Sequence, residues 1–258
     1  MAHELHVVGL MNVQFAIRDG MVYVLEVNPR SSRTVPFVSK AIGAPLAKLA
    51  MQVMMGRTLE QIRFTTERVP AHYSVKEAVF PFNKFPGTDV LLGPEMRSTG
   101  EVMGIADTFG AAFLKSQAGA GSTLPMNGRL FISVKDKDKP GVVALARRFL
   151  ELGFAVEATR GTAGYLGEHG VSVETVNKVT EGRPHIVDHI KNREIQMVIN
   201  TVGDKVSQAD SASIRRAALV HAVPYITTMA GARAALMGIE AGVKRRLSVK
   251  PLQEYYAT

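Results

Sequence analysis

The second half of the sequence, from Arg129 onward, alternates regularly between short apolar runs and amphipathic helical patterns. The runs typical of strands cover 129–134, 154–159, 171–179, 196–201 and 224–227. Helical patterns separate them at 140–153, 160–170, 185–192, 211–221 and 230–240. Strands that are joined through helices pair in parallel by right-handed crossovers. The alternation therefore predicts an α/β domain with one doubly wound parallel sheet, in a Rossmann-type three-layer architecture.

The first part of the chain has a different pattern. Asp19-Gly20 is a tight-turn signal between two apolar, β-branched runs, which predicts a hairpin of residues 7–18 and 21–28. Pro36 and Pro45 then occur where prolines open helices. We expect two helices there, followed by a less regular stretch.

The best linker signal lies between these two parts. Residues 57–107 are expected to be irregular, and a short helix is expected at about 108–118. Small, turn-forming residues then fill 119–128, as is typical of a linker. We therefore predict three segments, which are a first domain at 1–118, a linker at 119–128 and the α/β domain at 129–258.

Composition argues against several classes of protein. The formal net charge is +8, but Lys and Arg occur only in short clusters, aromatic residues make up 7% and Trp is absent. Nucleic-acid binding, which favours clustered cations and stacking platforms, is therefore not expected. No apolar run reaches the roughly 18 residues of a membrane span, so no membrane partner is expected either. Without Cys or a secretion signal, the expected location is cytoplasmic.

Polar residues follow several of the predicted strands of the α/β domain. Ligands of such sheets bind outside the carboxyl ends of the strands, where strand order reverses. Thr159 and Thr162 flank Gly161 at a predicted helix start, where backbone N–H groups favour an anion. The other candidates at this edge are two lysines, an amide and a hydroxyl, namely Lys139, Lys178, Asn200 and Thr201. This set predicts a site for a phosphate and a ribose.

A simpler interpretation applies to each of these residues alone. Ser and Thr before helices are ordinary caps, and lysines at strand ends are often only solvated. Their occurrence along one edge of one sheet is what favours a shared site.

The predicted hairpin carries a second set of candidates. Glu26 and Asn28 are two residues apart on a strand, so both side chains project from one face. A strict two-residue turn would pair Gln14 with Leu25, so Gln14 lies either diagonal to Glu26 or opposite it through a bulge or a longer turn. Three oxygen donors with one carboxylate suit Mg²⁺ that bridges nucleotide phosphates. An exposed polar strand face is the simpler alternative.

Two arginines follow these donors. Arg30 and Arg33 lie just beyond the second strand. There they are candidates to neutralise charge on a transferred phosphoryl group, which is a catalytic role.

Residues 129–240 resemble the methylglyoxal-synthase-like domain, and the run 177–186 resembles the version in carbamoyl phosphate synthetase. The segments 9–16 and 25–30 are similar to the last two strands of the second ATP-grasp unit of the large subunit of that family. The resemblance implies the carboxy-terminal part of this subunit, with an incomplete ATP-grasp remnant before a regulatory domain. That domain binds a pyrimidine monophosphate, or in some members a purine monophosphate. Val202 departs from the pattern, which often has Thr, and this implies one hydrogen bond fewer.

The resemblance carries over residue by residue. The positions matching the phosphate and ribose contacts of the family are Lys139, Thr159, Thr162, Lys178, Asn200 and Thr201. In bacterial members, residues matching Glu77 and Thr227 help to bind the activator ornithine.

The resemblance also implies partners and cofactors. The complete enzyme is an ATP-dependent ligase of pyrimidine and arginine biosynthesis that uses Mg²⁺ or Mn²⁺ with ATP. Its partners are the rest of the large subunit and the glutaminase small subunit. We expect the chain to be a truncated frame or a fragment, to hold no cofactor tightly and to be catalytically inactive alone.

Three alternatives remain. One is a free-standing methylglyoxal synthase, a lyase whose catalytic Asp lies in a loop ending Gly-Gly-Asp. This chain has no such loop, and its corresponding stretch is 178–185. Another is the cyclohydrolase domain of purine synthesis, which shares the fold. The third is a non-catalytic oligomerisation module, which would form a homo-oligomer.

Overall fold

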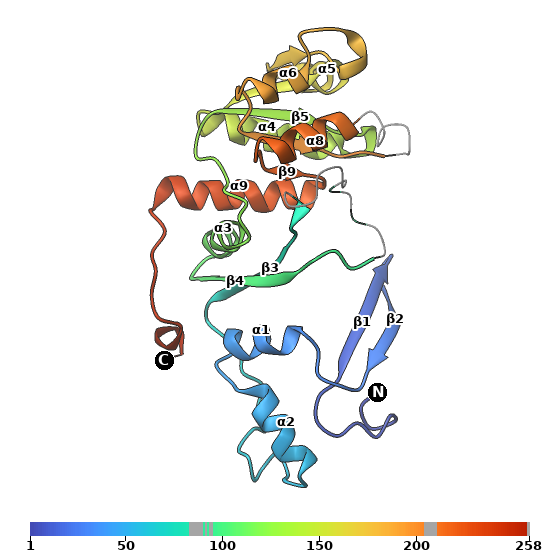
Figure 1. Cartoon of the computed structure of the whole chain (residues 1–258), viewed down its shortest axis with the longest axis vertical. Helices are drawn as coiled ribbons and strands as arrows, with labels where there is room; N and C mark the ends of the chain where they lie inside the picture. The colour runs from blue at the N-terminus through green and yellow to red at the C-terminus, as the bar shows by residue number, and fades with distance from the viewer. Residues whose placement is uncertain (83–89, 91, 93–94, 204–210, 257–258) are drawn as a thin grey trace. The chain divides into compact units, whose positions relative to one another are not determined.

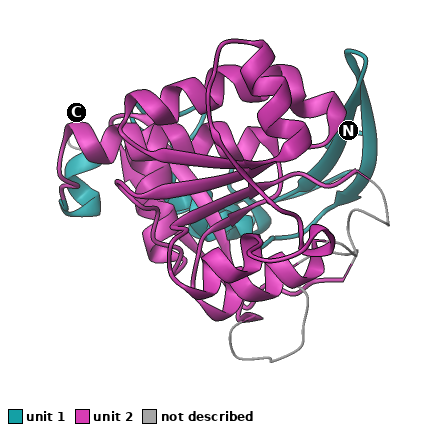
Figure 2. Cartoon of the chain, turned by 90° about the horizontal axis from the view of Figure 1, so that it is seen from above, with its two compact units in different colours: residues 1–72, 249–258 teal, residues 73–248 magenta. Residues whose placement is uncertain are grey.

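The fold was analysed in a computed structural model, which describes residues 1–82, 90, 92, 95–203 and 211–256. Figure 1 shows the helices and strands along the chain. The contacts within the chain group it into two compact units, one of residues 1–72 with 249–258 and one of residues 73–248 (Figure 2).

The first unit contains a hairpin and two helices. Strands β1 (Asn12–Arg18) and β2 (Met21–Asn28) pair in an antiparallel manner around Asp19-Gly20, both of which have positive φ. The hairpin is therefore confirmed, although its first strand begins at residue 12 and not at residue 7. The helices α1 (Thr34–Ala41) and α2 (Leu46–Met54) start near Pro36 and Pro45, as expected. A short 3-10 helix, η4 (Leu252–Tyr255), completes the unit.

The second unit begins with a strand pair that the sequence did not suggest. Strands β3 (Tyr73–Val79) and β4 (Gly100–Ala106) pair in an antiparallel manner. The prediction that 57–107 is irregular was therefore wrong for these two segments. Twenty residues separate the strands, so no tight-turn signal marks the pair, and β4 contains two glycines, which weaken strand propensity.

One of these glycines allows a helix to lie against the pair. A Cβ on Gly104 would come within 1.9 Å of the carbonyl oxygen of Ala112 in helix α3 (Phe109–Gly119). Gly110 gives α3 a similarly close approach to helix α9 (Met229–Lys244), because its Cβ would lie 2.3 Å from the carbonyl oxygen of Met237.

This packing explains where the compact units divide. The division falls between residues 72 and 73, and not at the predicted linker 119–128. Leu124 in that segment is 3% exposed and packs near Gly238 of α9. Because α3 and α9 pack closely, residues that precede the predicted linker belong to the same compact unit as the sheet that follows it. The assignment of 1–118 and 129–258 as family domains stays a prediction.

The remainder of the second unit is the predicted doubly wound sheet. Its five strands pair in parallel in the order β7-β6-β5-β8-β9. Their bounds are β5 Arg129–Ser133, β6 Ala155–Thr159, β7 Glu174–Val176, β8 Met197–Asn200 and β9 Tyr225–Ile226. The connecting helices besides α9 are α4 Lys139–Glu151, α5 Arg160–Glu168, α6 Ile186–Lys191 and α8 Ala212–Val220.

Two short 3-10 helices interrupt the alternation. They are η2 (Asp136–Asp138) after β5 and η3 (Val179–Glu181) after β7. The extended run expected at 171–179 is therefore shorter than predicted. Strand order reverses between β5 and β8, so the switch point lies at the carboxyl ends of these two strands.

One apolar cluster lies on each face of the sheet, so that the sheet and the helices on its two faces form three layers. Leu130 and Ile132 of β5 belong to a cluster with α4, α5 and α9, whereas Phe131 belongs to a cluster with α6 and α8. Successive strand residues point to opposite faces, so each face of the sheet has its own helical layer. The predicted stripe of α4 (Val142, Leu145, Ala146 and Phe149) is buried.

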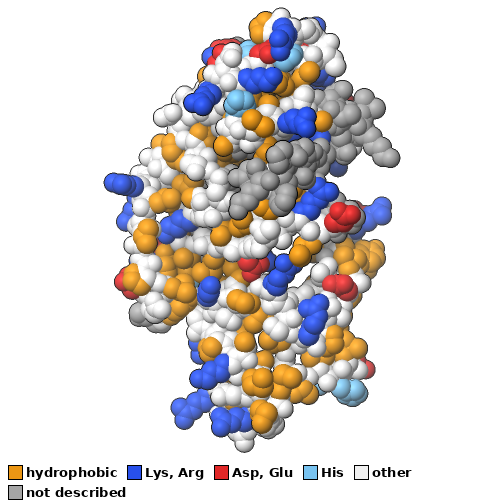
Figure 3. Space-filling model, in the orientation of Figure 1, with side chains coloured by type: hydrophobic (Ala, Val, Ile, Leu, Met, Phe, Trp, Pro, Cys, Tyr) orange, Lys and Arg blue, Asp and Glu red, His pale blue; other side chains and the backbone are white. Residues whose placement is uncertain are grey.

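The surface carries no single continuous basic area on the face shown in Figure 3, where coloured Lys and Arg side chains lie scattered among apolar and uncharged atoms. Within the described part of the chain, no helix combines the length and apolar character needed to cross a bilayer.

Candidate functional site

A cavity of about 300 Å³ lies at the switch point of the sheet. Residues at the carboxyl ends of β5, β6 and β8 and at the start of α8 line it. Its polar lining comes from Ser133, Lys135, Asp136, Thr159, Lys178, Thr180, Asn200, Thr201 and Ser211. Four of the six predicted phosphate and ribose residues are among them. The location is the one at which doubly wound sheets hold ligands.

The two predicted threonines form a buried hydroxyl cluster. Thr159 Oγ1 lies 3.3 Å from Ser133 Oγ and 3.3 Å from Thr162 Oγ1. Thr162 also accepts a hydrogen bond of 3.3 Å from the backbone N–H of Val134. Thr162 is 2% exposed and does not line the cavity, so it positions Thr159 and the end of β5 from behind.

Few atoms lie close to Gly161 at the start of α5. The ideal Cβ position of Gly161 has a single side-chain atom within 4 Å, the Lys139 Nζ at 4.0 Å. Lys139 Nζ also lies 2.8 Å from the Asp136 carboxylate, and this hydrogen bond holds the pKa of Asp136 below its ordinary value. The structure thus places the Lys139 ammonium beside the helix start, next to a residue of the cavity.

Asn200 and Thr201 both line the cavity and hold its walls together. Asn200 Nδ2 donates to Ser211 Oγ at 3.0 Å, and Thr201 Oγ1 accepts from the backbone N–H of Lys135 at 3.2 Å. Lys178 lines the same cavity with an exposed side chain, while its backbone N–H donates to Glu181 at 2.9 Å.

The sequence reasoning missed Lys135 and Ser211. Lys135 follows β5 almost directly, and its Nζ lies 3.4 Å from the carbonyl oxygen of Val202 and 3.7 Å from Asp138. The same rule of inspecting the residues just after each strand could have found it. Ser211 reaches the cavity from the start of α8, which no local pattern links to this edge of the sheet.

The hairpin brings its predicted donors together. Gln14 lies directly opposite Glu26, because the register shifts between Gln14 and Phe15, where Leu25 of β2 is the extra residue of a bulge, and this settles the two pairings left open. Asn28 Nδ2 lies 2.8 Å from Glu26, and Arg30 lies 3.4 Å from Asn28 Oδ1. Arg33 stands at the N-cap of α1.

The side-chain oxygens of these hairpin residues are of the kind that hard cations prefer as ligands. A carboxylate and two amide oxygens suit Mg²⁺ or Mn²⁺ when water and nucleotide complete the shell. Among the residues that the structure describes, no cluster of three or more His, Cys, Asp or Glu side chains could hold a metal without such help.

Glu77 and Thr227 lie in the second unit. Glu77 is on β3, where burial raises the pKa of its carboxyl and a hydrogen bond with Gln117 opposes this shift. Thr227 directly follows β9 and is exposed.

Two family models match the chain. Residues 141–227 match the MGS-like domain, and residues 1–62 match the ATP binding domain of the carbamoyl-phosphate synthase L chain. The chain is 55% identical to the carbamoyl phosphate synthase large chain of Nostoc sp. over 260 residues, and 56% identical to that of Mesorhizobium japonicum over 262 residues. These alignments cover 99% and 100% of this chain but 24% and 22% of the relatives, so the chain spans about a quarter of their length.

A solved structure is also similar to part of the chain. Methylglyoxal synthase from Elizabethkingia anophelis matches with a TM-score of 0.37 and 23% identity, covering 44% of this chain and 79% of that protein.

Proposed function

Because the chain belongs to the carbamoyl phosphate synthase large-chain family, as a carboxy-terminal region with an MGS-like domain, we propose that this domain binds a nucleoside monophosphate. The observation that carries the proposal is the convergence of Thr159, Lys178 and Asn200 on one cavity at the switch point of the sheet. These residues come from three separate connections, and their convergence on one cavity supports a shared ligand site.

The phosphate end of the ligand is proposed to lie at the start of α5. Free backbone N–H groups at a helix start attract an anion, and Gly161 leaves room for it. Thr159 then supplies a hydroxyl from the end of β6, while Lys139 beside the helix start and Lys178 in the cavity lining supply positive charge. Lys135, which also lines the cavity, adds a third cation.

The ribose and base are proposed to lie toward β8. Asn200 and Thr201 offer an amide and a hydroxyl for ribose oxygens, and Val179 and Ile214 line the cavity as apolar surface for a base. Val202 lines the cavity without a hydroxyl, so the ligand is proposed to form one hydrogen bond fewer than with the Thr that the family pattern often has.

In the complete enzyme, this nucleotide is proposed to regulate ATP-dependent carbamoyl phosphate synthesis for pyrimidine and arginine biosynthesis in the cytoplasm. The proposed partners are the rest of the large subunit and the glutaminase small subunit. Glu77 and Thr227 are proposed to help bind ornithine as a second effector. The half-buried carboxyl of Glu77 supports this, because an ammonium group would relieve the cost of its desolvation.

The hairpin is proposed to belong to the ATP site of the complete enzyme. There, Gln14, Glu26 and Asn28 would hold Mg²⁺ or Mn²⁺, which neutralises phosphate charge when bound, and Arg30 and Arg33 would face the transferred phosphoryl group. Several large apolar side chains of the hairpin are about half exposed or more, among them Phe15, Ile17, Val22, Val24 and Leu25. Such exposure supports a lobe that further protein covers, so the isolated chain is expected to be inactive.

A methylglyoxal-synthase-type lyase remains the second candidate, because the carboxylate of Asp136 lines the cavity. That carboxylate is a weak base, since its hydrogen bond to Lys139 lowers its pKa. Phosphate release from dihydroxyacetone phosphate would support the lyase over the regulatory domain.

Calorimetric titration of the chain with uridine monophosphate, inosine monophosphate and ornithine tests the proposal. We expect a nucleotide to bind, and Lys178→Ala to weaken binding by roughly 1–3 kcal/mol, the range for a lost charged hydrogen bond. Lys137→Ala removes the same charge from an exposed position outside the cavity lining and serves as the control. An absence of nucleotide binding, or an equal effect of both variants, would overturn the proposal.

A further inference from the structure

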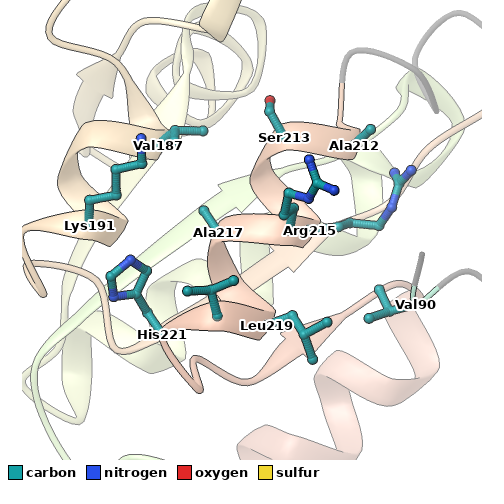
Figure 4. A pocket seen from close by; sticks show the side chains of 11 residues that line it. Val90, Val187, Lys191, Ala212, Ser213, Arg215, Ala217, Leu219 and His221 are labelled. Atoms are coloured by element: carbon teal, nitrogen blue, oxygen red, sulfur yellow. The ribbon is translucent and has the colours of Figure 1, made fainter. Parts of the chain in front are cut away.

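A second and larger cavity lies between α6 and α8, with a volume of about 520 Å³. Figure 4 shows Val187 and Lys191 on one side and Ser213, Arg215 and Ala217 on the other. This cavity shares no lining residue with the nucleotide cavity. It is therefore a separate site candidate that the proposed function does not use.

The polar lining of this cavity is basic. Lys191, Arg215, Arg216 and His221 line it, and the described lining contains no acidic residue. Within the described part of the chain, Lys191, Arg216 and His221 form no ion pair. Lys191 and Arg216 are exposed, so their charges lie at the mouth of the cavity.

Arg215 differs from the other cations because it is only 3% exposed. A guanidinium has five N–H donors in a planar fork, and this fork matches a carboxylate or a phosphate through two parallel hydrogen bonds. Burying such a charged group in the wall of a cavity costs free energy unless it has polar partners. An anion in the cavity would be a further partner for Arg215.

The rest of the lining is apolar. Val90, Val187, Ala217, Leu219 and Val220 contribute aliphatic surface, and Val220 is 72% exposed. Concave sites for small molecules are mostly apolar with a few polar groups that fix orientation, and they have volumes of about 300–1,000 Å³. This cavity has both properties.

We propose that the cavity between α6 and α8 binds a small organic anion that carries one acidic group on an apolar body. The acidic group pairs with Arg215 and Arg216, and Lys191 adds positive charge at the mouth. The apolar body packs against Val187 and Leu219. A purely inorganic anion would leave this aliphatic surface uncovered, so an amphipathic ligand fits the lining better.

Phenylbutyrate and its neutral amide, phenylbutyramide, form a matched pair of probes for the full chain. Methyl NMR spectra report binding through the signals of Val187, Leu219 and Val220. We expect saturable shifts of these methyl groups with phenylbutyrate, and binding of the amide weaker by at least about tenfold, because a charged hydrogen bond is lost. Equal binding of both probes, or an absence of saturable shifts at these methyl groups, overturns the proposal.

Variants and competition make the test specific. The exposed pair Lys191→Gln and Arg216→Gln is expected to weaken phenylbutyrate binding by at least about tenfold. The double variant of Lys137→Gln and Arg147→Gln removes the same charge elsewhere and is expected to change it by less than about twofold. Binding is also expected to persist with saturating uridine monophosphate, and competition by that nucleotide would place the probe in the other cavity and overturn the proposal.

Discussion

Asn200 Nδ2 donates a hydrogen bond of 3.0 Å to Ser211 Oγ, and both residues are less than a tenth exposed. This bond ties the end of β8 to the start of α8, the helix that separates the two cavities. Ser211 lines the nucleotide cavity, and Ala212 and Ser213 line the other. One buried contact therefore fixes the wall between the two candidate sites.

Ser211→Ala removes the acceptor of this bond and leaves the amide of Asn200 buried. We expect the free energy of unfolding to fall by about 1–3 kcal/mol, the cost of an unsatisfied buried polar group. Urea unfolding followed by circular dichroism measures this. Ser213→Ala, two residues further along the same helix and only half-buried, is the control and should change stability by less than about 0.5 kcal/mol. Similar losses for both variants would contradict the assigned contact.

Glu157 is 1% exposed and forms a salt bridge with Arg129, which raises the pKa of that guanidinium, and a 2.9 Å contact with His189. Glu157→Gln removes the buried charge from this network, and we expect a loss of about 2–4 kcal/mol in the free energy of unfolding. The control is Glu174→Gln, because Glu174 contacts the same Arg129 but its side chain is 64% exposed. An exposed pair contributes less than about 1 kcal/mol, so equal losses in urea unfolding would contradict the prediction.

Gly104 permits the close approach of β4 and α3. A Cβ there would lie 1.9 Å from the carbonyl oxygen of Ala112, so Gly104→Ala forces the helix away from the strand pair. We expect a loss of about 3 kcal/mol or more in stability. Gly100→Ala, on the same strand, meets nothing within 4 Å and should cost less than about 1 kcal/mol. The midpoints of thermal unfolding of the two variants measure this difference. Equal midpoints for both variants would show that β4 does not approach α3 closely.

Desolvation raises the pKa of the Glu77 carboxyl above its ordinary value. The protonated form therefore favours the folded state, so this group disfavours folding progressively as the pH rises through the ordinary pKa of a Glu and then through the raised one. Glu77→Gln should therefore stabilise the chain more at pH 7 than at pH 4. We expect the gain in the free energy of unfolding over the unaltered chain to be less than about 1 kcal/mol, because the side chain is only half-buried.

The exposed Glu168→Gln on α5 is the control for Glu77 and should show no such difference between the two pH values. Urea unfolding at both values measures the effect. A decrease in stability of Glu77→Gln at pH 7 would mean that the carboxylate has a stabilising partner and that desolvation does not dominate.

The sequence predicted most of the α/β domain because its signals are local. The stripe of α4, the turn at Asp19-Gly20 and the helix starts near Pro36 and Pro45 each depend on neighbours a few residues away. The strand pair β3–β4 was missed because a long segment separates the two strands in the chain and Gly104 weakens the strand pattern. Its stability comes from contact with α3, which no local pattern expresses.

The candidate site divides in the same way. The rule that ligands bind beyond the carboxyl ends of strands found Thr159, Lys178, Asn200 and Thr201, since that edge follows from strand order alone. It did not find Ser211, because the start of α8 reaches the cavity only through the folded chain. It also could not decide that Thr162 lies behind the wall, since side-chain burial depends on what packs in front.

The amino-acid sequence by itself determined the alternation of elements, the parallel sheet, the family of the chain and the residue types along one edge of the sheet. Only the tertiary structure decided that Gln14 faces Glu26 through a bulge, that the compact units divide before Tyr73 and that α8 separates two cavities. The physical reason is the sequence separation of the interacting residues, because hydrophobic periodicity and turn chemistry act between near neighbours in the chain. Register, cavity walls and buried contacts arise from packing between segments far apart in the chain.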